Sequence, residues 1–135
     1  MLVLSLEADS ASSTVLLALP RNCRLLKPGD FRRVFSSGKR SADVYFTVLA
    51  RNNGLGRARL GLAISKKRCR RAVDRNHLKR LIRESFRESQ TLLSGMDIVV
   101  LNKRFIPETR NRRYFVSLSK HWRVLIEKCG QSSPF

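Results

Sequence analysis

The chain has 135 residues and a formal net charge of +18, with 28 Lys and Arg against 10 Asp and Glu. This length suits one domain, and a charge of this size predicts a polyanionic partner, nucleic acid before an anionic membrane. We expect no membrane partner, because no apolar run approaches the ~18 residues that a membrane span needs.

Few residues suit catalysis or metal binding by the protein itself. Cys23, Cys69 and Cys129 lie far apart without a CxxC pair, so we expect no disulfide framework and no zinc site, and a cytoplasmic location fits. His77 and His121 are too distant in sequence to suggest a metal centre, and the scarce carboxylates argue against a two-metal nuclease. The sequence therefore predicts no catalytic residue and no metal ligand in the protein.

Residues 1–19 contain no Lys or Arg, although the chain as a whole is strongly basic. They do not match a secretory signal, because Glu7 and Asp9 lie where a basic start and an apolar centre are needed. We expect a disordered and dispensable N-terminal extension, with a translation start further downstream, at Val15, as the alternative.

The next segments predict one helix and two strands. Residues 28–38 have Pro and Asp near the start and Gly at the end, which is typical of a short helix, with Phe31 and Phe35 on one face. Residues 45–51 and 59–65 predict strands separated by a turn rich in Asn and Gly. The second strand alternates large and small side chains, so one face should pack a core while the other lets another backbone approach.

Residues 66–87 carry the strongest signal in the chain. The second half has apolar residues at three- and four-residue steps, which predicts an amphipathic helix. Only Asp74 and Glu84 oppose the positive charge. Like charges at four-residue spacing repel one another, and a polyphosphate partner would offset this cost. We therefore favour such a partner over a face that is only solvated. The ten basic residues are Lys66, Lys67, Arg68, Arg70, Arg71, Arg75, Lys79, Arg80, Arg83 and Arg87.

Two further elements complete the domain. Residues 97–103 predict a third strand, and residues 112–129 predict a last helix with an apolar stripe. Residues 130–135 are expected to form a C-terminal tail. The order is helix, strand, strand, helix, strand, helix, with a βαβ unit around the basic helix, which indicates a single α+β domain over residues 20–129.

The run SKKRCRRAVDRNHLKRLIRESFR, between the strands RLGLAI and DIVVLNK, resembles the signature of the bacterial ribonuclease P protein subunit. The upstream segment RLLKPGDFRRVFSSGKR resembles the first helix of that family, and the resemblance covers about residues 20–128. It implies a ribosomal-protein-like αββαβα two-layer sandwich with a left-handed βαβ crossover, although the general default is right-handed.

The resemblance also implies a role and partners. The protein would be the accessory subunit of an endoribonuclease, ribonuclease P, in which a catalytic RNA holds the Mg²⁺ ions and performs the cleavage. One protein would pair with one RNA and help it to remove the 5′ leader of precursor tRNA by binding that leader. Neither a cofactor on the protein nor a DNA partner is expected.

Two sites follow from the resemblance, and the first is the signature itself. Its Arg and Lys side chains would neutralise phosphates, while Asn76 can donate and accept a hydrogen bond. The family pattern Arg-Asn-Arg here ends in His77, which is largely neutral at pH 7. The residues expected to face the catalytic RNA are Lys67, Arg68, Arg71, Arg75, Asn76, His77, Lys79, Arg80 and Arg83.

The second site is a cleft between the first helix and the bare sheet face, which would bind the single-stranded leader. Such a strand needs aromatic or apolar contact for its bases and peripheral charge for its backbone. Phe31 and Phe35 match aromatic positions of the cleft, with ordinary core packing as the alternative for both. The expected residues are Phe31, Phe35, Tyr45, Thr47, Leu49, Ala63, Ser65, Lys66 and Lys103.

Two other functions fit the size and charge. A ribosome-associated RNA-binding protein without a processing role would have the same composition and an α+β core. A DNA-binding regulator would use residues 71–87 as a recognition helix, but it would also need a helix-turn-helix or a dimer element, and the sequence shows neither.

Overall fold

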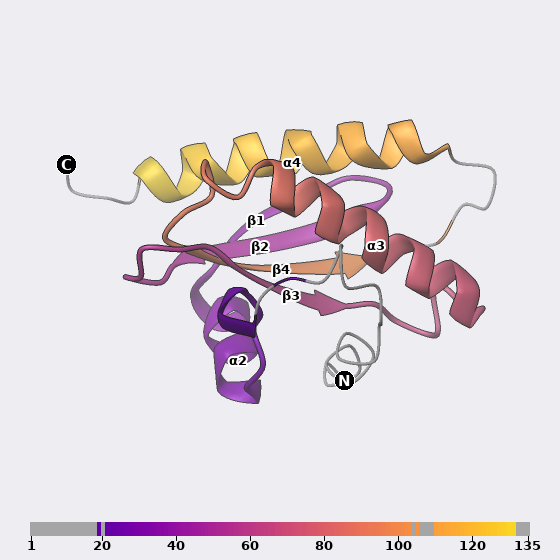
Figure 1. Cartoon of the computed structure of the whole chain (residues 1–135), viewed down its shortest axis with the longest axis horizontal. Coiled ribbons are helices and arrows are strands. Elements are labelled where there is room, and N and C mark those ends of the chain that lie inside the picture. Colours follow the sequence, from indigo (N-terminus) through magenta and orange to yellow (C-terminus); the bar gives the residue numbers. More distant parts are fainter. Residues whose placement is uncertain (1–18, 20, 104, 106–109, 132–135) are drawn as a thin grey trace.

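The computed structural model describes residues 19, 21–103, 105 and 110–131, and residues 1–18, 20, 104, 106–109 and 132–135 are not described. Figure 1 shows α3 and α4 on one side of a four-stranded sheet and α2 on the other. The helices are η2 (Arg21–Cys23), α2 (Pro28–Ser37), α3 (Ala72–Glu88) and α4 (Asn111–Gln131). The strands are β1 (Lys39–Ala42), β2 (Phe46–Asn52), β3 (Arg59–Ala63) and β4 (Met96–Asn102).

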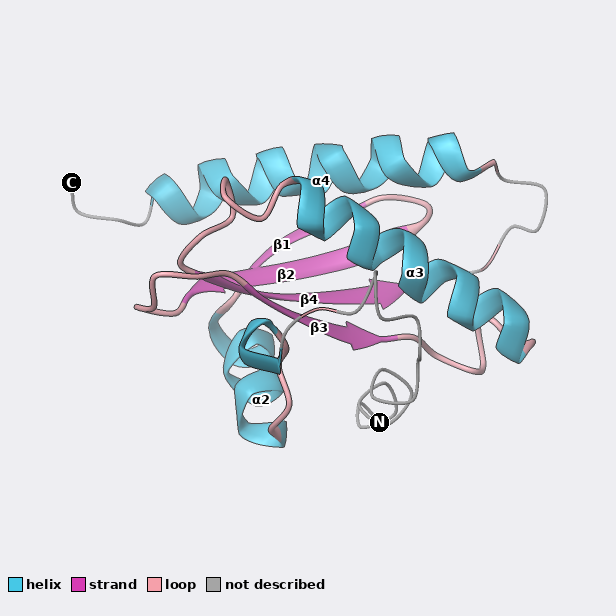
Figure 2. Cartoon of the chain, in the orientation of Figure 1, coloured by secondary structure: helices cyan, strands magenta, loops and turns pink. Residues whose placement is uncertain are grey.

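The sheet has the strand order β1-β2-β4-β3. Strand β2 is antiparallel to β1 and to β4, whereas β3 and β4 are parallel neighbours connected through α3. The crossover through α3 is left-handed, against the right-handed default (Figure 1). Helices α3 and α4 cover one face of the sheet, and α2 covers part of the other (Figure 2). The α+β prediction is confirmed, and the face beneath α2 is where a binding cleft was expected.

The main core lies between the sheet and helices α3 and α4. Trp122 and Phe86 are fully buried there, and Nε1 of Trp122 donates to Oγ of Ser85 at 2.9 Å. The alternation predicted for β3 is confirmed, because its large side chains join this core and its small ones face α2. Within the described ranges, no helix combines the length and apolarity that crossing a membrane requires.

The expected domain boundaries shift slightly at both ends. Leu19 is 4% exposed and belongs to the main core, so it is part of the domain and not of an extension. The rest of the expected extension, residues 1–18, lies outside the described residues. At the other end α4 continues to Gln131, past the expected boundary at Cys129, and the rest of the expected tail is not described.

Strand β1 is missing from the sequence prediction because KRSA has no apolar alternation, and short charged strands are typical of sheet edges. Polar contacts attach it to α4. Oγ of Ser41 lies 2.7 Å from Nδ1 of His121, and Nε2 of His121 lies 3.2 Å from Oδ2 of Asp43. His121 is 1% exposed, and burial holds its pKa below the ordinary value although the charge of Asp43 opposes this. A neutral imidazole therefore anchors the edge strand.

Candidate nucleic-acid interface

Residues 65–71, the basic loop, connect β3 to α3 at one end of the sheet. The amide of Ser65 donates to Oδ1 of Asn102 at 2.7 Å, and the amide of Cys69 donates to the carbonyl of Ser65 at 3.0 Å. The amide of Phe105 donates to the carbonyl of Arg68 at 3.0 Å. These bonds hold the backbone of the loop in place without a partner. The exposed cations that it carries are Lys66, Lys67, Arg68, Arg70 and Arg71.

Arg75 braces this loop against the first turn of α3. Its Nη1 donates to the carbonyl of Cys69 at 3.1 Å and to that of Arg70 at 2.6 Å. The side chain is partly buried. A guanidinium keeps its charge when it binds carbonyls, so Arg75 adds to the positive field while it also orders the loop.

The exposed face of α3 carries Asn76, His77 and Arg80. Nε2 of His77 lies 2.8 Å from Oδ1 of Asn111, which connects this face to the first residue of α4. Arg80 pairs with Glu84 at 3.5 Å, yet its side chain stays 60% exposed. Because an exposed pair of this kind contributes only about 0–1 kcal/mol, Arg80 can exchange Glu84 for a phosphate at little cost.

Two of the expected RNA contacts do not lie on this exposed face. Lys79 and Arg83 are only 5% and 8% exposed. A step of four residues turns an α-helix about 40° beyond a full turn, so a stripe with this spacing drifts off any one face. Their burial does not support the expectation that these two side chains face the catalytic RNA.

The face of the sheet beneath α2 has a regular cross-strand arrangement. Directly paired residues point to the same face, so the strand register places their side chains in rows. Two rows form in this way, and in each of them the residue from β2 stays partly exposed, as does Leu101 of β4, whereas the other members are buried. The two rows are Leu49–Val99–Gly61 and Thr47–Leu101–Ala63.

Helix α2 docks on this face through Phe31, which is 4% exposed. A Cβ at Gly61 would lie 2.8 Å from two ring carbons of Phe31, so the ring can pack this closely only on glycine. Phe31 is thus a core residue. Because its side chain is buried, the expectation that its ring stacks on bases is not supported. Phe35 is partly buried and packs against the same cluster as Leu49 and Leu101.

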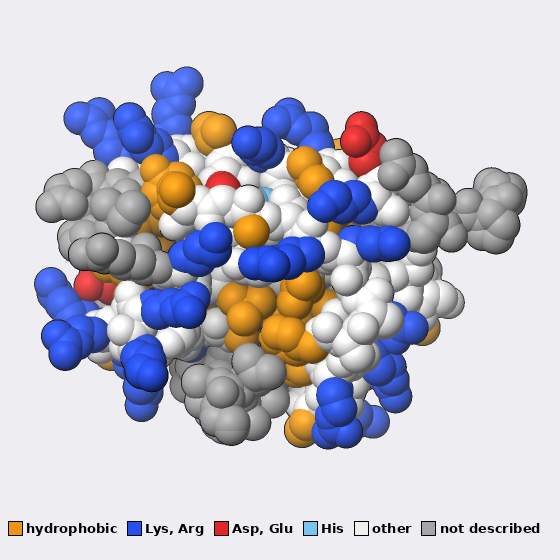
Figure 3. Space-filling view, turned by 180° about the vertical axis from the view of Figure 1, so that it is seen from behind, with side chains coloured by type: hydrophobic (Ala, Val, Ile, Leu, Met, Phe, Trp, Pro, Cys, Tyr) orange, Lys and Arg blue, Asp and Glu red, His pale blue; other side chains and the backbone are white. Residues whose placement is uncertain are grey.

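Phe35, Leu49 and Leu101 together form what we call the apolar patch. All three keep part of their surface exposed although they contact a buried cluster. Figure 3 shows apolar side chains gathered on the side of the molecule that faces away in Figure 1, with Lys and Arg side chains around them. Apolar surface with a basic border suits a single strand of nucleic acid.

Tyr45 does not belong to the apolar patch. It precedes β2, in a turn where Oδ1 of Asp43 accepts from the amides of Tyr45 and Phe46 at 2.8 and 3.0 Å. Its ring meets that of Tyr114 edge-on, with centroids 5.3 Å apart, and packs against the main core. The expectation that Tyr45 lines the leader cleft is not supported, because its ring packs against the main core and not against the cluster beneath α2.

The remaining expected leader contacts lie where the basic loop meets the apolar patch. Ala63 is buried beneath α2, Ser65 and Lys103 are partly exposed, and Lys66 is exposed. Two hydrogen bonds between Ser65 and Asn102 bring the residues that follow β3 and β4 to one end of the sheet. The two predicted sites therefore adjoin.

Sequence reasoning misses Leu101 and Arg40 on this surface. Leu101 lies two residues before Lys103 in the predicted strand 97–103. Because residues two apart in a strand lie on the same face, choosing Lys103 as a leader contact also indicates Leu101. Arg40 pairs with Leu49 and is exposed, which puts a cation at the β1 side of the patch. No sequence signal marks Arg40, because β1 lacks an apolar pattern.

The chemistry available at these surfaces is that of binding. The described residues include no group of three or more His, Cys, Asp or Glu side chains suited to a metal ion. Burial raises the pKa of the Cys69 and Cys129 thiols, so neither is an activated nucleophile at neutral pH. Cations for phosphates lie beside apolar side chains for bases.

The sequence comparisons agree on one family. A sequence model of the family described as Ribonuclease P matches residues 19–126. The chain is 47% identical over 116 residues to the ribonuclease P protein component of Methylococcus capsulatus, which covers 85% of this chain and 91% of that protein. It is 46% identical over 109 residues to the same component of Salmonella arizonae, with 81% and 92% covered.

Solved structures agree with the sequence relatives. The RNase P protein from Staphylococcus aureus is similar with a TM-score of 0.69 and 31% identity, over 76% of this chain and 94% of that one. The RNase P protein from Thermotoga maritima is similar with a TM-score of 0.59 and 32% identity, over 78% and 96%. Fold and sequence therefore point to the same group of proteins.

Proposed function

This chain belongs to the ribonuclease P protein family, and we propose that it serves the holoenzyme through two adjoining surfaces. As a ribonuclease P protein component it is a subunit of an endoribonuclease in tRNA processing, with the ribonuclease P RNA and precursor tRNA as partners. In our proposal the basic loop and the exposed face of α3 contact the catalytic RNA, and the apolar patch contacts the 5′ leader.

The assignment of the RNA contact rests on the cations of the basic loop, whose backbone is ordered without a partner. The backbone of the basic loop is hydrogen-bonded along its length, so its cations lose little conformational freedom when they meet phosphates. Asn76 and Arg80 extend the same surface along α3. Arg75 supports this surface because its guanidinium binds two carbonyls of the basic loop.

One observation carries the assignment of the leader contact. Phe35, Leu49 and Leu101 stay partly exposed beside α2, next to the end of the sheet where Lys66 and Lys103 lie. A single strand can place its bases on the apolar patch and its phosphates against these lysines, with Arg40 at the opposite border. Phe31 acts indirectly, because it holds α2 on the sheet.

The metal ions of the reaction are assigned to the RNA partner. Mg²⁺ prefers carboxylate and phosphate oxygens, and a protein with 28 basic and 10 acidic residues presents few of the former. We further propose one protein for each RNA and action in the cytoplasm, where precursor tRNA is processed.

The test compares leader-bearing and leaderless ligands. Phe35→Ala in the reconstituted holoenzyme should weaken binding of precursor tRNA by roughly 5- to 150-fold, the equivalent of about 1–3 kcal/mol for one stacked base. Binding of mature tRNA, which has no leader, should not change. Equilibrium binding of both ligands measures the difference.

Two further variants serve as controls for this result. Phe35→Leu keeps apolar volume and should lose only the part of the affinity that depends on a flat ring. Val116→Ala removes an apolar side chain that is 61% exposed on α4 and should leave both affinities unchanged. Equal losses for precursor and mature tRNA with Phe35→Ala would show that the apolar patch does not contact the leader.

A further inference from the structure

A second basic region lies at the opposite end of β3 from the basic loop. There the structure has an open pocket of about 320 Å³ beside the start of α2. Asn22, Leu26 and Asp30 contribute to its wall, and its basic lining residues are Arg24, Lys27, Arg57 and Arg59. Neither of the two surfaces proposed above includes any of these residues.

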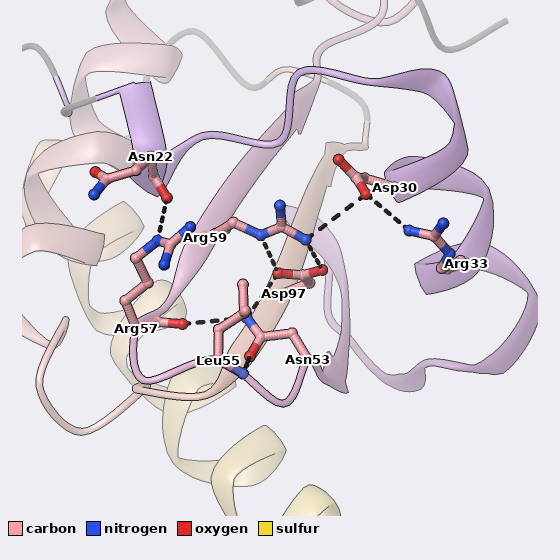
Figure 4. A network of polar contacts seen from close by, with 8 residues as sticks. All are labelled: Asn22, Asp30, Arg33, Asn53, Leu55, Arg57, Arg59 and Asp97. Atoms are coloured by element: carbon pink, nitrogen blue, oxygen red, sulfur yellow. Dashed lines mark hydrogen bonds and ion pairs between the residues drawn. The ribbon is translucent and has the colours of Figure 1, made fainter.

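Among the described residues, acidic side chains neutralise one of the four cations, Arg59. Arg59 binds Asp97 through two hydrogen bonds, at 2.8 and 2.7 Å, and also lies 3.7 Å from Asp30 (Figure 4). Asp30 pairs more closely with Arg33, at 2.9 Å. The carboxylates near this pocket are therefore already engaged, and Arg59 forms the fixed rear of the pocket.

The other three cations have no acidic partner within ion-pair distance among the described residues. Nε of Arg57 donates to the carbonyl of Asn22 at 2.7 Å, which fixes the guanidinium and leaves its two terminal nitrogens for other acceptors (Figure 4). Lys27 is exposed at the start of α2. The pocket thus has an excess of positive charge that the acidic side chains of the described residues do not balance.

Arg24 provides the most specific observation. Its Nε is shielded from solvent, yet it makes no hydrogen bond within the described structure. Buried donors are nearly always paired, because an unpaired one costs about 1–3 kcal/mol, and more on a charged group. The described residues therefore leave this charged group unsatisfied, and a phosphate in the pocket can accept from the Arg24 guanidinium once the side chain turns towards it.

From these contacts we infer that Arg24, Lys27 and Arg57 form a phosphate-binding site that is separate from the basic loop and the apolar patch. Two guanidinium groups and one ammonium supply several N–H donors around one pocket, and the several oxygens of a phosphate can accept from more of them than a carboxylate can. The group can come from an RNA backbone or from free phosphate. The RNA source rests on the function proposed above, whereas phosphate binding itself does not.

The first experiment uses the full chain and inorganic phosphate alone. Backbone amide NMR spectra at physiological salt should show saturable shifts at Leu26, Lys27 and Arg57 as phosphate is added. Arg57→Gln and Lys27→Gln should each weaken this binding about tenfold, as the loss of one charge-assisted hydrogen bond predicts. Arg123→Gln removes an exposed cation on α4 and should leave it unchanged.

These measurements distinguish phosphate binding at this pocket from non-specific binding to a strongly basic chain. Lys27 is exposed, and its side chain has no hydrogen bond or ion pair with the other described residues. Lys27→Gln should therefore stay folded and provide the test even if another variant is unstable. Shifts that do not saturate at the pocket, or that persist equally in Lys27→Gln and Arg57→Gln, would overturn the inference. Neither result bears on the ribonuclease P function, because no RNA is present.

A second experiment identifies the source of the phosphate. The Lys27→Gln, Arg57→Gln double variant is titrated with ribonuclease P RNA at several salt concentrations. If an RNA phosphate occupies the site, the log–log salt slope should fall by about one, as the loss of one phosphate contact predicts, and added phosphate should compete. An unchanged slope together with lost phosphate binding assigns the site to free phosphate or a phosphorylated small molecule.

Discussion

Replacing Gly61 with alanine tests how α2 is held on the sheet. The added Cβ would lie 2.8 Å from Cε1 and Cζ of Phe31 and 3.1 Å from Cδ1 of Leu25. These neighbours are only 4% and 1% exposed, so neither has room to retreat. Overpacking a close-packed core costs about 1–3 kcal/mol, so we expect Gly61→Ala to lower the melting temperature by roughly 5–15 °C.

The same change should affect function. Phe35 lies one turn beyond Phe31 in α2, so a helix displaced from the sheet carries Phe35 away from Leu49. Holoenzyme with Gly61→Ala should therefore bind leader-bearing precursor more weakly while its affinity for mature tRNA is kept. Urea unfolding followed by circular dichroism measures the stability, and equilibrium binding measures the two affinities.

Gly29→Ala is the matched control. Gly29 lies in the same helix, and a Cβ there meets no atom within 4 Å. Alanine is favoured over glycine in a helix, so this variant should equal the wild type or exceed its stability by up to about 1 kcal/mol. If Gly61→Ala is as stable as Gly29→Ala and binds the leader normally, the packing of α2 on Gly61 does not shape the cleft.

Three other predictions follow from individual contacts. Phe31→Ala should lower the unfolding free energy by about 3–5 kcal/mol in urea titrations, as loss of a buried ring does, and a cost below 1 kcal/mol would contradict its assignment to the core. Arg80→Ala should lower the log–log salt slope for the catalytic RNA by about one in filter binding, and an unchanged slope would show that this face stays solvated. Stability should fall as the pH drops from about 7 to 5, because unfolded His121 takes up a proton near its ordinary pKa of 6.5 while burial lowers the folded pKa. Urea titrations across this range should show that His121→Gln lacks this part of the pH dependence and that exposed His77→Gln retains it.

The sequence predicts those parts of the fold that have a strong apolar period. Helix α3 and strands β2, β3 and β4 lie within a few residues of their expected positions. The helix has apolar residues at three- and four-residue steps, and the strands are short, mainly apolar segments. Strand β1 has no such pattern, and pairing with β2 and contacts to α4 create it. Tertiary contacts of this kind leave no local signal.

The sequence predicts which segments form the site, but not which of its side chains are exposed. Residue type and spacing indicate a basic helix, but they do not tell that Lys79 is buried while Arg80 is exposed. Nor do they decide between core and cleft for Phe31 and Phe35, which lie one turn apart on the same helix. The close approach of Phe31 to Gly61 decides it, and that distance exists only in the folded chain.

The most direct measurement is a reconstitution with ribonuclease P RNA and precursor tRNA at a Mg²⁺ concentration where the RNA alone is slow. The account predicts that the protein accelerates release of the 5′ leader, and that the protein without RNA releases none. No acceleration by folded, RNA-bound protein, or specific leader removal by highly purified protein alone, would contradict the assignment of binding to the protein and cleavage to the RNA.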